Sequence, residues 1–166
     1  IKHLGLCGVK FHPDYQEFMI DEEKMFPIYD VISSLQLPAV FHTGMDPLSP
    51  NLIHAPSQKV AKVAKFFPKM ILIAAHMGGM HRYEEAEEYL FPQENVYLDT
   101  AMSSHYCPPE QFARLIYKHG PERILFASDC PWSKSCDEVE YLNRVPLTDR
   151  DKELILSGNI MRLLKL

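Results

Sequence analysis

The sequence predicts an α/β fold built on a parallel sheet, and two observations lead to this prediction. First, five short apolar runs, each about one strand long, are hydrophobic almost throughout, as are strands covered on both faces. These runs are Leu4–Phe11, Leu37–His42, Met70–His76, Asn95–Ala101 and Arg123–Asp129. Second, segments with helical patterning separate the runs. Strands that alternate with helices form a parallel sheet with right-handed crossover connections.

Amphipathic patterns and end signals define three of the helices. In Asp21–Gln36 and in Ser57–Phe67, the apolar residues recur at helical spacing and form one stripe. Pro109 suits the first turn of the next helix, where a missing N–H costs nothing, and Gly120 suits its end.

Further signals stand near the ends of the later helices. Thr148 and Asp151 resemble a capping box that opens a helix at "KELILS". Asn159 is expected to cap a final helix, "IMRLLKL". His119 lies at the end of the helix that begins at Pro109, where a positive charge interacts favourably with the helix dipole.

The composition is that of one ordinary globular domain. Of the 166 residues, 46% are hydrophobic and 23% are charged, and the formal net charge is −5. The acidic balance argues against a nucleic-acid partner, and no run approaches the roughly 20 apolar residues of a membrane span. The four cysteines show no CxxC spacing, so we interpret them as free thiols and predict a cytoplasmic location.

Titratable side chains stand where the apolar runs end. Lys10 and His12, His42, His76, and Asp129 occupy the ends of four runs. The runs begin about 25 to 33 residues apart, close to the roughly 31 residues per unit of a (β/α)8 barrel. A doubly wound sheet tolerates the same spacing but gathers its ligand contacts at one switch point. Polar residues at several strand ends are typical of a barrel, whose sites lie at the C-terminal ends of its strands.

The histidines and the aspartate at these ends predict a metal site. Imidazole nitrogen is a common ligand of zinc and similar ions, and a carboxylate adds a hard, charged oxygen. A single buried histidine is usually a core residue. His42, His76 and Asp129, however, stand at matching positions on three runs, which favours a shared site.

Alternation along each strand predicts the neighbours of these groups. Ala74 is expected on the same face as His76, where its small side chain leaves room beneath the imidazole. Asp99 is expected to make a structural hydrogen bond near its strand end. The opposite face is expected to pack against helices and carries three aromatic residues, Phe11, Phe41 and Phe126.

The ordered series of motifs resembles a known family. "GVKFHP", "AVFHTG", "ILIAAHMGG", "VYLDT", "ILFASDCPW" and "NIMRLLKL" look like the later strands of the metal-dependent amidohydrolase superfamily, and most like its amidohydrolase-2 group. The resemblance spans essentially the whole chain. It implies a (β/α)8 TIM-barrel type fold of which strands 4 to 8 and their helices are present, so that residues 1–166 form the C-terminal part of a single hydrolase barrel domain.

The resemblance also implies roles for the polar residues. His42 corresponds to the metal ligand on strand 5 and Asp129 to the ligand on strand 8. His76 corresponds to the strand-6 histidine, which binds a second metal in some members and orients the metal-bound water in others. Asp129 and His76 are thus the expected catalytic groups, and the expected cofactor is a divalent metal, zinc or alternatively manganese.

Lys10 and His12 have two interpretations. Some superfamily members carry a carboxylated lysine on strand 4 that bridges two metals, and the Lys-x-His pattern permits this. The interpretation that we favour makes Lys10 an unmodified lysine that contacts an anionic substrate, with His12 as a second substrate contact.

The chain departs from the family at one point. The first strand of the family supplies a His-x-His pair to the metal, and this sequence contains no His-x-His. We therefore expect the chain to pair with the missing N-terminal part of the barrel or to form a homo-oligomer, because a partial barrel leaves its edge strands unpaired.

Two classes of function remain open. The first is a metal-dependent hydrolase that uses a metal-activated water on a small carbonyl or carboxylate substrate, with a metal-dependent decarboxylase of the same group as the alternative. The second is a non-catalytic fragment or assembly module. The loops after the strands determine the substrate, and their sequences do not indicate which substrate the protein takes.

Overall fold

The computed structural model describes residues 2–166 and contains one parallel sheet of five strands. Each strand pairs in parallel with the next strand along the chain, so the order in the sheet is the order in the sequence. Each of the five predicted runs contains one strand. The strands are β1 (Val9–Phe11), β2 (Ala39–Phe41), β3 (Leu72–Ala74), β4 (Val96–Asp99) and β5 (Ile124–Leu125).

The sequential strand order distinguishes a barrel from a doubly wound sheet, the two architectures that the spacing of the apolar runs left open. In a doubly wound sheet the strand order reverses at a switch point. Here no reversal occurs among the described strands, which is the arrangement of an arc of a (β/α) barrel. The α/β prediction and its barrel type are therefore confirmed.

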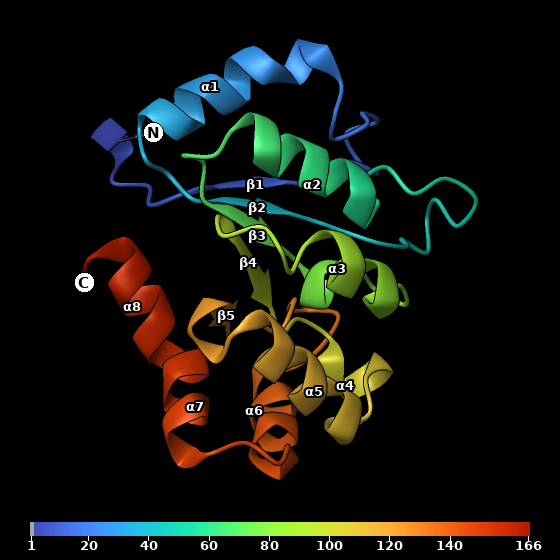
Figure 1. Ribbon diagram of the computed structural model, residues 1–166, viewed down its shortest axis with the longest axis vertical. Coiled ribbons are helices and arrows are strands. Elements are labelled where there is room, and N and C mark those ends of the chain that lie inside the picture. Colours follow the sequence, from blue (N-terminus) through green and yellow to red (C-terminus); the bar gives the residue numbers. More distant parts are fainter. Residues whose placement is uncertain (1) are drawn as a thin grey trace.

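Helices follow the strands in chain order. In the view of Figure 1, α1 and α2 lie toward the top, near β1 and β2, and α5, α6 and α7 lie toward the bottom, near and beyond β5. None of the helices in residues 2–166 combines the length and apolar character needed to cross a bilayer. The helices are α1 (Phe26–Ser34), α2 (Ser57–Phe66), α3 (Tyr83–Tyr89), α4 (Ser103–Tyr106), α5 (Pro109–His119), α6 (Ser135–Arg144), α7 (Asp149–Glu153) and α8 (Asn159–Leu164). Short 3-10 turns occupy Lys2–Leu4, Glu23–Met25, His76–Gly78 and Pro121–Arg123.

Aromatic residues join the first two strands to the helical layer. The rings of Phe11 and Phe41 stack with centroids 5.0 Å apart. Tyr29 of α1 meets both rings edge-on, at 5.9 and 5.6 Å, and its hydroxyl donates to the carbonyl of Ile20. Edge-to-face contacts of this kind suit the quadrupoles of aromatic rings. The predicted packing of Phe11 and Phe41 against helices is thus confirmed, and it fixes the register of β1 and β2.

The placement of Ala74 corrects one expectation. Ala74 is in register with Phe41, so it lies on the face that packs against the helices and not beneath the imidazole of His76. His76 departs from the strand alternation because its φ is +57°, in the left-handed region. Asp129, in the loop after β5, also has a left-handed φ, of +64°.

The C-terminal helices confirm one capping prediction and correct another. The Thr148 side chain accepts a hydrogen bond from the Asp151 N–H and caps α7, as predicted. Asn159 is not a cap, because a π-helical turn at Leu154–Gly158 joins α7 to α8 without a break. Its buried amide instead donates to the carbonyls of Pro121 and Ile124, both at 2.7 Å, and ties the helix to β5.

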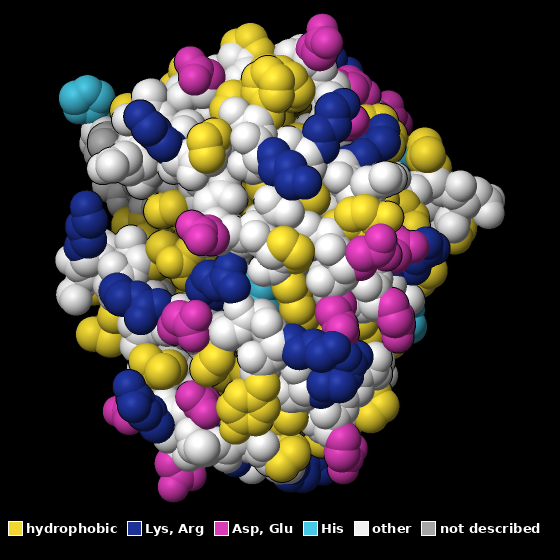
Figure 2. Space-filling model, in the orientation of Figure 1, with side chains coloured by type: hydrophobic (Ala, Val, Ile, Leu, Met, Phe, Trp, Pro, Cys, Tyr) yellow, Lys and Arg dark blue, Asp and Glu magenta, His cyan; other side chains and the backbone are white. Residues whose placement is uncertain are grey.

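Charges of both signs are interspersed on the face of the molecule that Figure 2 shows. Ion pairs at the surface of the molecule include those of Glu87 with Arg114 and Lys118. This face therefore carries no large field of one sign of charge.

Candidate metal centre

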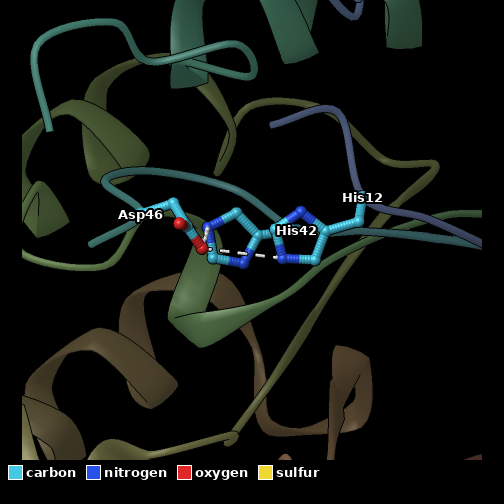
Figure 3. Close-up of side chains that lie close together, drawn as sticks. All are labelled: His12, His42 and Asp46. Carbon is cyan, nitrogen blue, oxygen red and sulfur yellow. Dashed lines mark ion pairs between the residues drawn. The ribbon is translucent and has the colours of Figure 1, made fainter. Parts of the chain in front are cut away.

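Two histidines meet where β1 and β2 end. Phe11 and Phe41 are in register, so His12 and His42, the next residues, emerge side by side. Their imidazole rings stack at 4.3 Å with an angle of 10° between the ring planes. Asp46, in the loop after β2, brings its Oδ2 to 3.6 Å from Nε2 of His12 and 3.7 Å from Nε2 of His42 (Figure 3). Nε2 of both histidines thus faces one carboxylate oxygen.

A hydrogen-bond chain fixes the tautomer of His42. Nδ1 of His76 lies 3.2 Å from the carbonyl oxygen of Ala101, which accepts only, so Nδ1 of His76 carries the proton. Nε2 of His76 is then the acceptor, and it receives a hydrogen bond of 3.0 Å from Nδ1–H of His42. Since His42 is protonated on Nδ1, its Nε2 atom carries a free lone pair. Burial, reinforced by the neighbouring His76, lowers the pKa of His42 to about 3, so the ring is neutral.

Two buried atoms of the site have no hydrogen-bond partner among the described residues. They are Nε2 of His42 itself and Oδ2 of Asp14, which lie 4.0 Å apart. The other oxygen of Asp14 accepts hydrogen bonds from Ser49 and His54. Burial raises the pKa of Asp14, but these two hydrogen bonds outweigh burial and lower it, so the carboxylate stays charged.

His42, but not Asp14, is among the described residues that line a cavity of about 330 Å³. Its polar lining consists of His12, His42, Asp46 and Asp129. The remaining lining is largely apolar and aromatic: Tyr15, Pro47, Leu48, Met80, Met102, Tyr106 and Trp132. A mostly apolar pocket with a few convergent polar groups is typical of a small-molecule site.

The structure separates the predicted site residues into two groups. His12, His42 and Asp129 line the cavity. His76 is buried against His42 but does not line the cavity, and both of its ring nitrogens are engaged. Lys10 is exposed and lies outside the cavity lining, which favours an unmodified lysine over a metal bridge.

Asp99 makes the structural hydrogen bonds that the sequence predicts. Its Oδ1 accepts from the backbone N–H groups of His76, at 2.9 Å, and of Ala101, at 3.1 Å. The side chain is buried, and it holds the left-handed turn that aims His76 at His42. Asp99 therefore positions His76 by accepting a hydrogen bond from its backbone N–H.

Sequence reasoning missed two acidic residues of the site. Asp14 follows His12 by two residues and Asp46 follows His42 by four, so both belong to loops and escape a search of strand ends. Their proximity along the chain to a strand-end histidine was the available signal. The cavity of a barrel is built from these loops as well as from the strands.

The donor set fits a divalent metal. His12, His42 and Asp46 offer ligand atoms that all lie within 4.8 Å of one another. Ligands at about 2.1 Å from a tetrahedral zinc ion stand roughly 3.4 Å apart, close to the separations of 3.6 and 3.7 Å here. Imidazole and carboxylate together suit zinc or manganese.

Three solved structures illustrate the likeness of this chain to known proteins. An uncharacterized TIM-barrel protein from Bordetella bronchiseptica aligns with 99% of the chain at a TM-score of 0.81 and 22% identity. The 5-carboxyvanillate decarboxylase of Sphingomonas paucimobilis aligns with 98% at 0.74 and 16% identity. A dihydroxybenzoic acid decarboxylase from Polaromonas, with bound manganese and the inhibitor 2-nitroresorcinol, aligns with 89% at 0.68 and 19% identity.

The chain spans 59% of the length of the first two of these structures and 55% of the third. At such identities the likeness establishes the fold, and with the sequential strand order it identifies part of a TIM barrel. No curated protein gives a significant match. The family model Amidohydro_2, described as amidohydrolase, matches residues 1–166. As its motifs predict, the chain belongs to this amidohydrolase family.

Proposed function

We propose that the protein is a metal-dependent hydrolase that activates water for attack on a small carbonyl or carboxylate compound. The observation that carries the proposal is the buried Nε2 lone pair of His42, which faces two carboxylates beside a cavity. A divalent cation lowers the pKa of water toward neutrality and polarises a carbonyl oxygen. Zinc is the proposed ion, with manganese as the alternative.

His42 and Asp129 are the proposed metal ligands that strands of this chain supply. Both line the same cavity, His42 directly after β2 and Asp129 in the loop after β5. A carboxylate there is also suited to carry a proton between water and the leaving group, which is the general acid–base role proposed for Asp129.

His76 is proposed to act through His42. Its Nε2 accepts a hydrogen bond from Nδ1–H of His42, which keeps the other nitrogen of His42 free for a ligand bond. In a direct catalytic or metal-binding role, Nε2 of His76 would give up this hydrogen bond and bind water, substrate or metal instead, so that role stays a prediction. The contact of Lys10 with substrate also stays a prediction.

Decarboxylation of an aromatic carboxylate is the second candidate. The rings of Tyr15, Tyr106 and Trp132 line the cavity, which suits a flat ring bound beside a metal. Two of the similar solved structures are decarboxylases of aromatic acids. The two reactions share the metal and differ in the bond that breaks.

Metal content and product analysis test the proposal. Elemental analysis of the wild type is expected to find stoichiometric zinc or manganese, and His42→Ala is expected to lose it. With metal, the wild type is expected to hydrolyse small esters, lactones or amides, whereas release of CO2 from aromatic acids would select the decarboxylase. Equal, near-zero metal in both proteins, without turnover, would overturn the proposal in favour of the non-catalytic module.

A further inference from the structure

The buried carboxylate of Glu138 lies in α6, outside the lining of the cavity. The side chain belongs to a residue only 1% exposed, and burial of a carboxyl group costs free energy unless hydrogen bonds satisfy its oxygens. We infer that Glu138 is a positioning residue: by holding the loop after β5 against the segment after β4, it fixes the part of the cavity wall that carries Asp129 and Trp132. The inference rests on the proposed function for the importance of that wall.

Three hydrogen bonds satisfy the Glu138 carboxylate. The Ser104 N–H donates to Oε2 at 3.1 Å, and the Ser104 hydroxyl donates to Oε1 at 2.6 Å. The Ser133 hydroxyl donates to the same Oε1 at 2.7 Å. Ser104 belongs to α4, which follows β4, and Ser133 belongs to the loop after β5. One side chain of α6 therefore bonds at once to segments that follow two neighbouring strands.

His105 extends this network. A carboxylate only accepts, so the Ser133 hydroxyl directs its proton to Glu138 and accepts, through its oxygen, from Nε2–H of His105 at 3.2 Å. His105 belongs to α4, as Ser104 does. The loop after β5 is thus joined to α4 twice, through Glu138 and through the contact of Ser133 with His105.

A second side chain of α6 holds the same segment. α4 packs against α6 (Figure 1). Tyr141 follows Glu138 by three residues, so both buried side chains lie on one face of the helix. The Tyr141 hydroxyl donates to the carbonyl of Cys107, the residue directly after α4, at 2.6 Å. Helix α6 therefore holds α4 near its start and after its end, and Glu138 extends this hold to the loop after β5.

The anchor at Ser133 acts on two residues of the cavity wall. Asp129 and Trp132 both line the cavity, and the Trp132 N–H donates to the Asp129 carbonyl at 2.9 Å, which closes a turn over residues 129–132. Ser133 is the next residue along the chain. Its bond to Glu138 therefore fixes the end of the turn that presents Asp129 and Trp132 to the cavity.

The held helix α4 contributes to the cavity as well. Met102 directly precedes α4 and Tyr106 ends it, and both line the cavity. An apolar side chain in place of Glu138 would fill the space between the segments without the cost of burying a carboxyl group. It would not bond to either segment, however, so a buried acid at this position favours a fixed arrangement of the wall over the greatest stability.

Trp132 is the single tryptophan of the chain, and its fluorescence reports on this wall without any ligand. The residue is 67% exposed, so the anchor of its backbone limits its motion more than packing does. Time-resolved anisotropy of the full 166-residue chain measures that motion. Ser133→Ala and Glu138→Met are each expected to raise the amplitude of the sub-nanosecond component roughly twofold. Glu140→Met, at an exposed position of α6, is the matched control.

Two further variants separate positioning from packing. Glu138→Gln keeps an oxygen for the Ser104 N–H and an amide group that can donate to both hydroxyls, so it is expected to retain the wild-type motion of Trp132. The double variant of Ser133→Ala and Glu138→Met is expected to move no more than Glu138→Met alone, because both changes remove the same bond. If Glu138→Met does not fold, Ser133→Ala, which lacks only a hydroxyl, still decides the outcome.

Zinc binding connects the wall to the proposed function. Because Asp129 is a proposed ligand, a looser turn is expected to weaken zinc binding by Ser133→Ala at least about threefold relative to Glu140→Met in calorimetry. Wild-type motion of Trp132 in Ser133→Ala, or an unchanged zinc affinity despite a looser Trp132, would overturn this inference and leave the proposed function standing. A wild type that binds neither zinc nor manganese would overturn the proposed function, whereas the Trp132 measurement needs no metal.

Discussion

At the scale of single residues, backbone conformation decides the site more than residue type does. His76 and Asp129, which follow β3 and β5 in the chain, both have left-handed backbone conformations, which cost free energy for residues with a side chain. Their identities and strand-end positions were predictable from the sequence. The left-handed turns were not, because nothing local demands them: Asp99, distant in sequence, holds the turn at His76.

The loop carboxylates mark the limit of prediction at this scale. Asp14 and Asp46 look like ordinary polar loop residues, and only the fold shows that their free oxygens converge on His42. The His42 position, by contrast, followed directly from the end of an apolar run. A sequence pattern thus locates groups on strands, whereas groups on loops need the closed tertiary structure.

His119 provides a prediction about pH. Although it ends α5, it is not the charged partner of the helix dipole that the sequence suggested, because it is buried and donates Nε2–H to the Val96 carbonyl at 3.1 Å. Burial, with a contribution from Arg123, lowers its pKa to about 3, against about 6.5 in the unfolded chain. Between these values the unfolded state binds the proton and the folded state does not, so stability falls as the pH falls below about 6.5.

Urea unfolding between pH 7 and pH 4 measures this effect. His119 is expected to contribute a slope of up to about 1.4 kcal/mol per pH unit to the free energy of unfolding, and His119→Gln is expected to be less sensitive to acid. His3→Gln, at an exposed position, should keep the wild-type slope. Parallel pH profiles for the wild type and His119→Gln would contradict the assignment.

At the scale of elements, helices with strong amphipathic or end signals were predicted closely. The third predicted helix begins at Pro109 and ends before Gly120, as α5 does. The predicted strands were too long: residues 4–8 before β1 are largely exposed, and the other runs continue past their strands into the connecting loops. Helices α3 and α6, rich in acidic residues and without such signals, were not predicted individually.

Asn159 provides a prediction at this scale. Its amide satisfies two buried carbonyls, so Asn159→Ala is expected to destabilise the protein by about 1–3 kcal/mol through unsatisfied acceptors and the lost contact between helix and strand. Ser157→Ala, an exposed position in the same helical segment, should change the free energy of unfolding by less than about 0.5 kcal/mol. Equal effects of the two substitutions in urea unfolding would show that Asn159 does not tie the helix to β5.

At the scale of the whole molecule, the sheet has two free edges in the described residues. β1 pairs with β2 alone and β5 with β4 alone. Exposed edges offer unpaired backbone groups to another strand. The fold class and strand order were predictable from the alternation of apolar runs and helices, but what covers these edges depends on a second surface and so lies beyond any pattern within one chain.

We expect the isolated chain to self-associate through these edges. Val9 and Phe11 make the backbone hydrogen bonds to β2. By alternation, the N–H of Lys10 points away from β2, toward the free edge of the sheet. Lys10→Pro is therefore expected to weaken association while preserving the β1–β2 pairing, and Lys10→Ala, which keeps the N–H, is the matched control. Sedimentation of the wild type as a monomer at all concentrations would contradict this expectation.

The sequential strand order has a further consequence for how the molecule forms. Because every strand joins its successor after one intervening helical segment, no pairing waits for a distant part of the chain to arrive. The entropy of closing loops between contacting residues opposes folding, and here the register partners Phe11 and Phe41, and Phe41 and Ala74, are separated by similar lengths of chain. This topology allows the sheet to grow by one unit at a time, so that the end of β2, with both histidines in place, can form before β5 is paired.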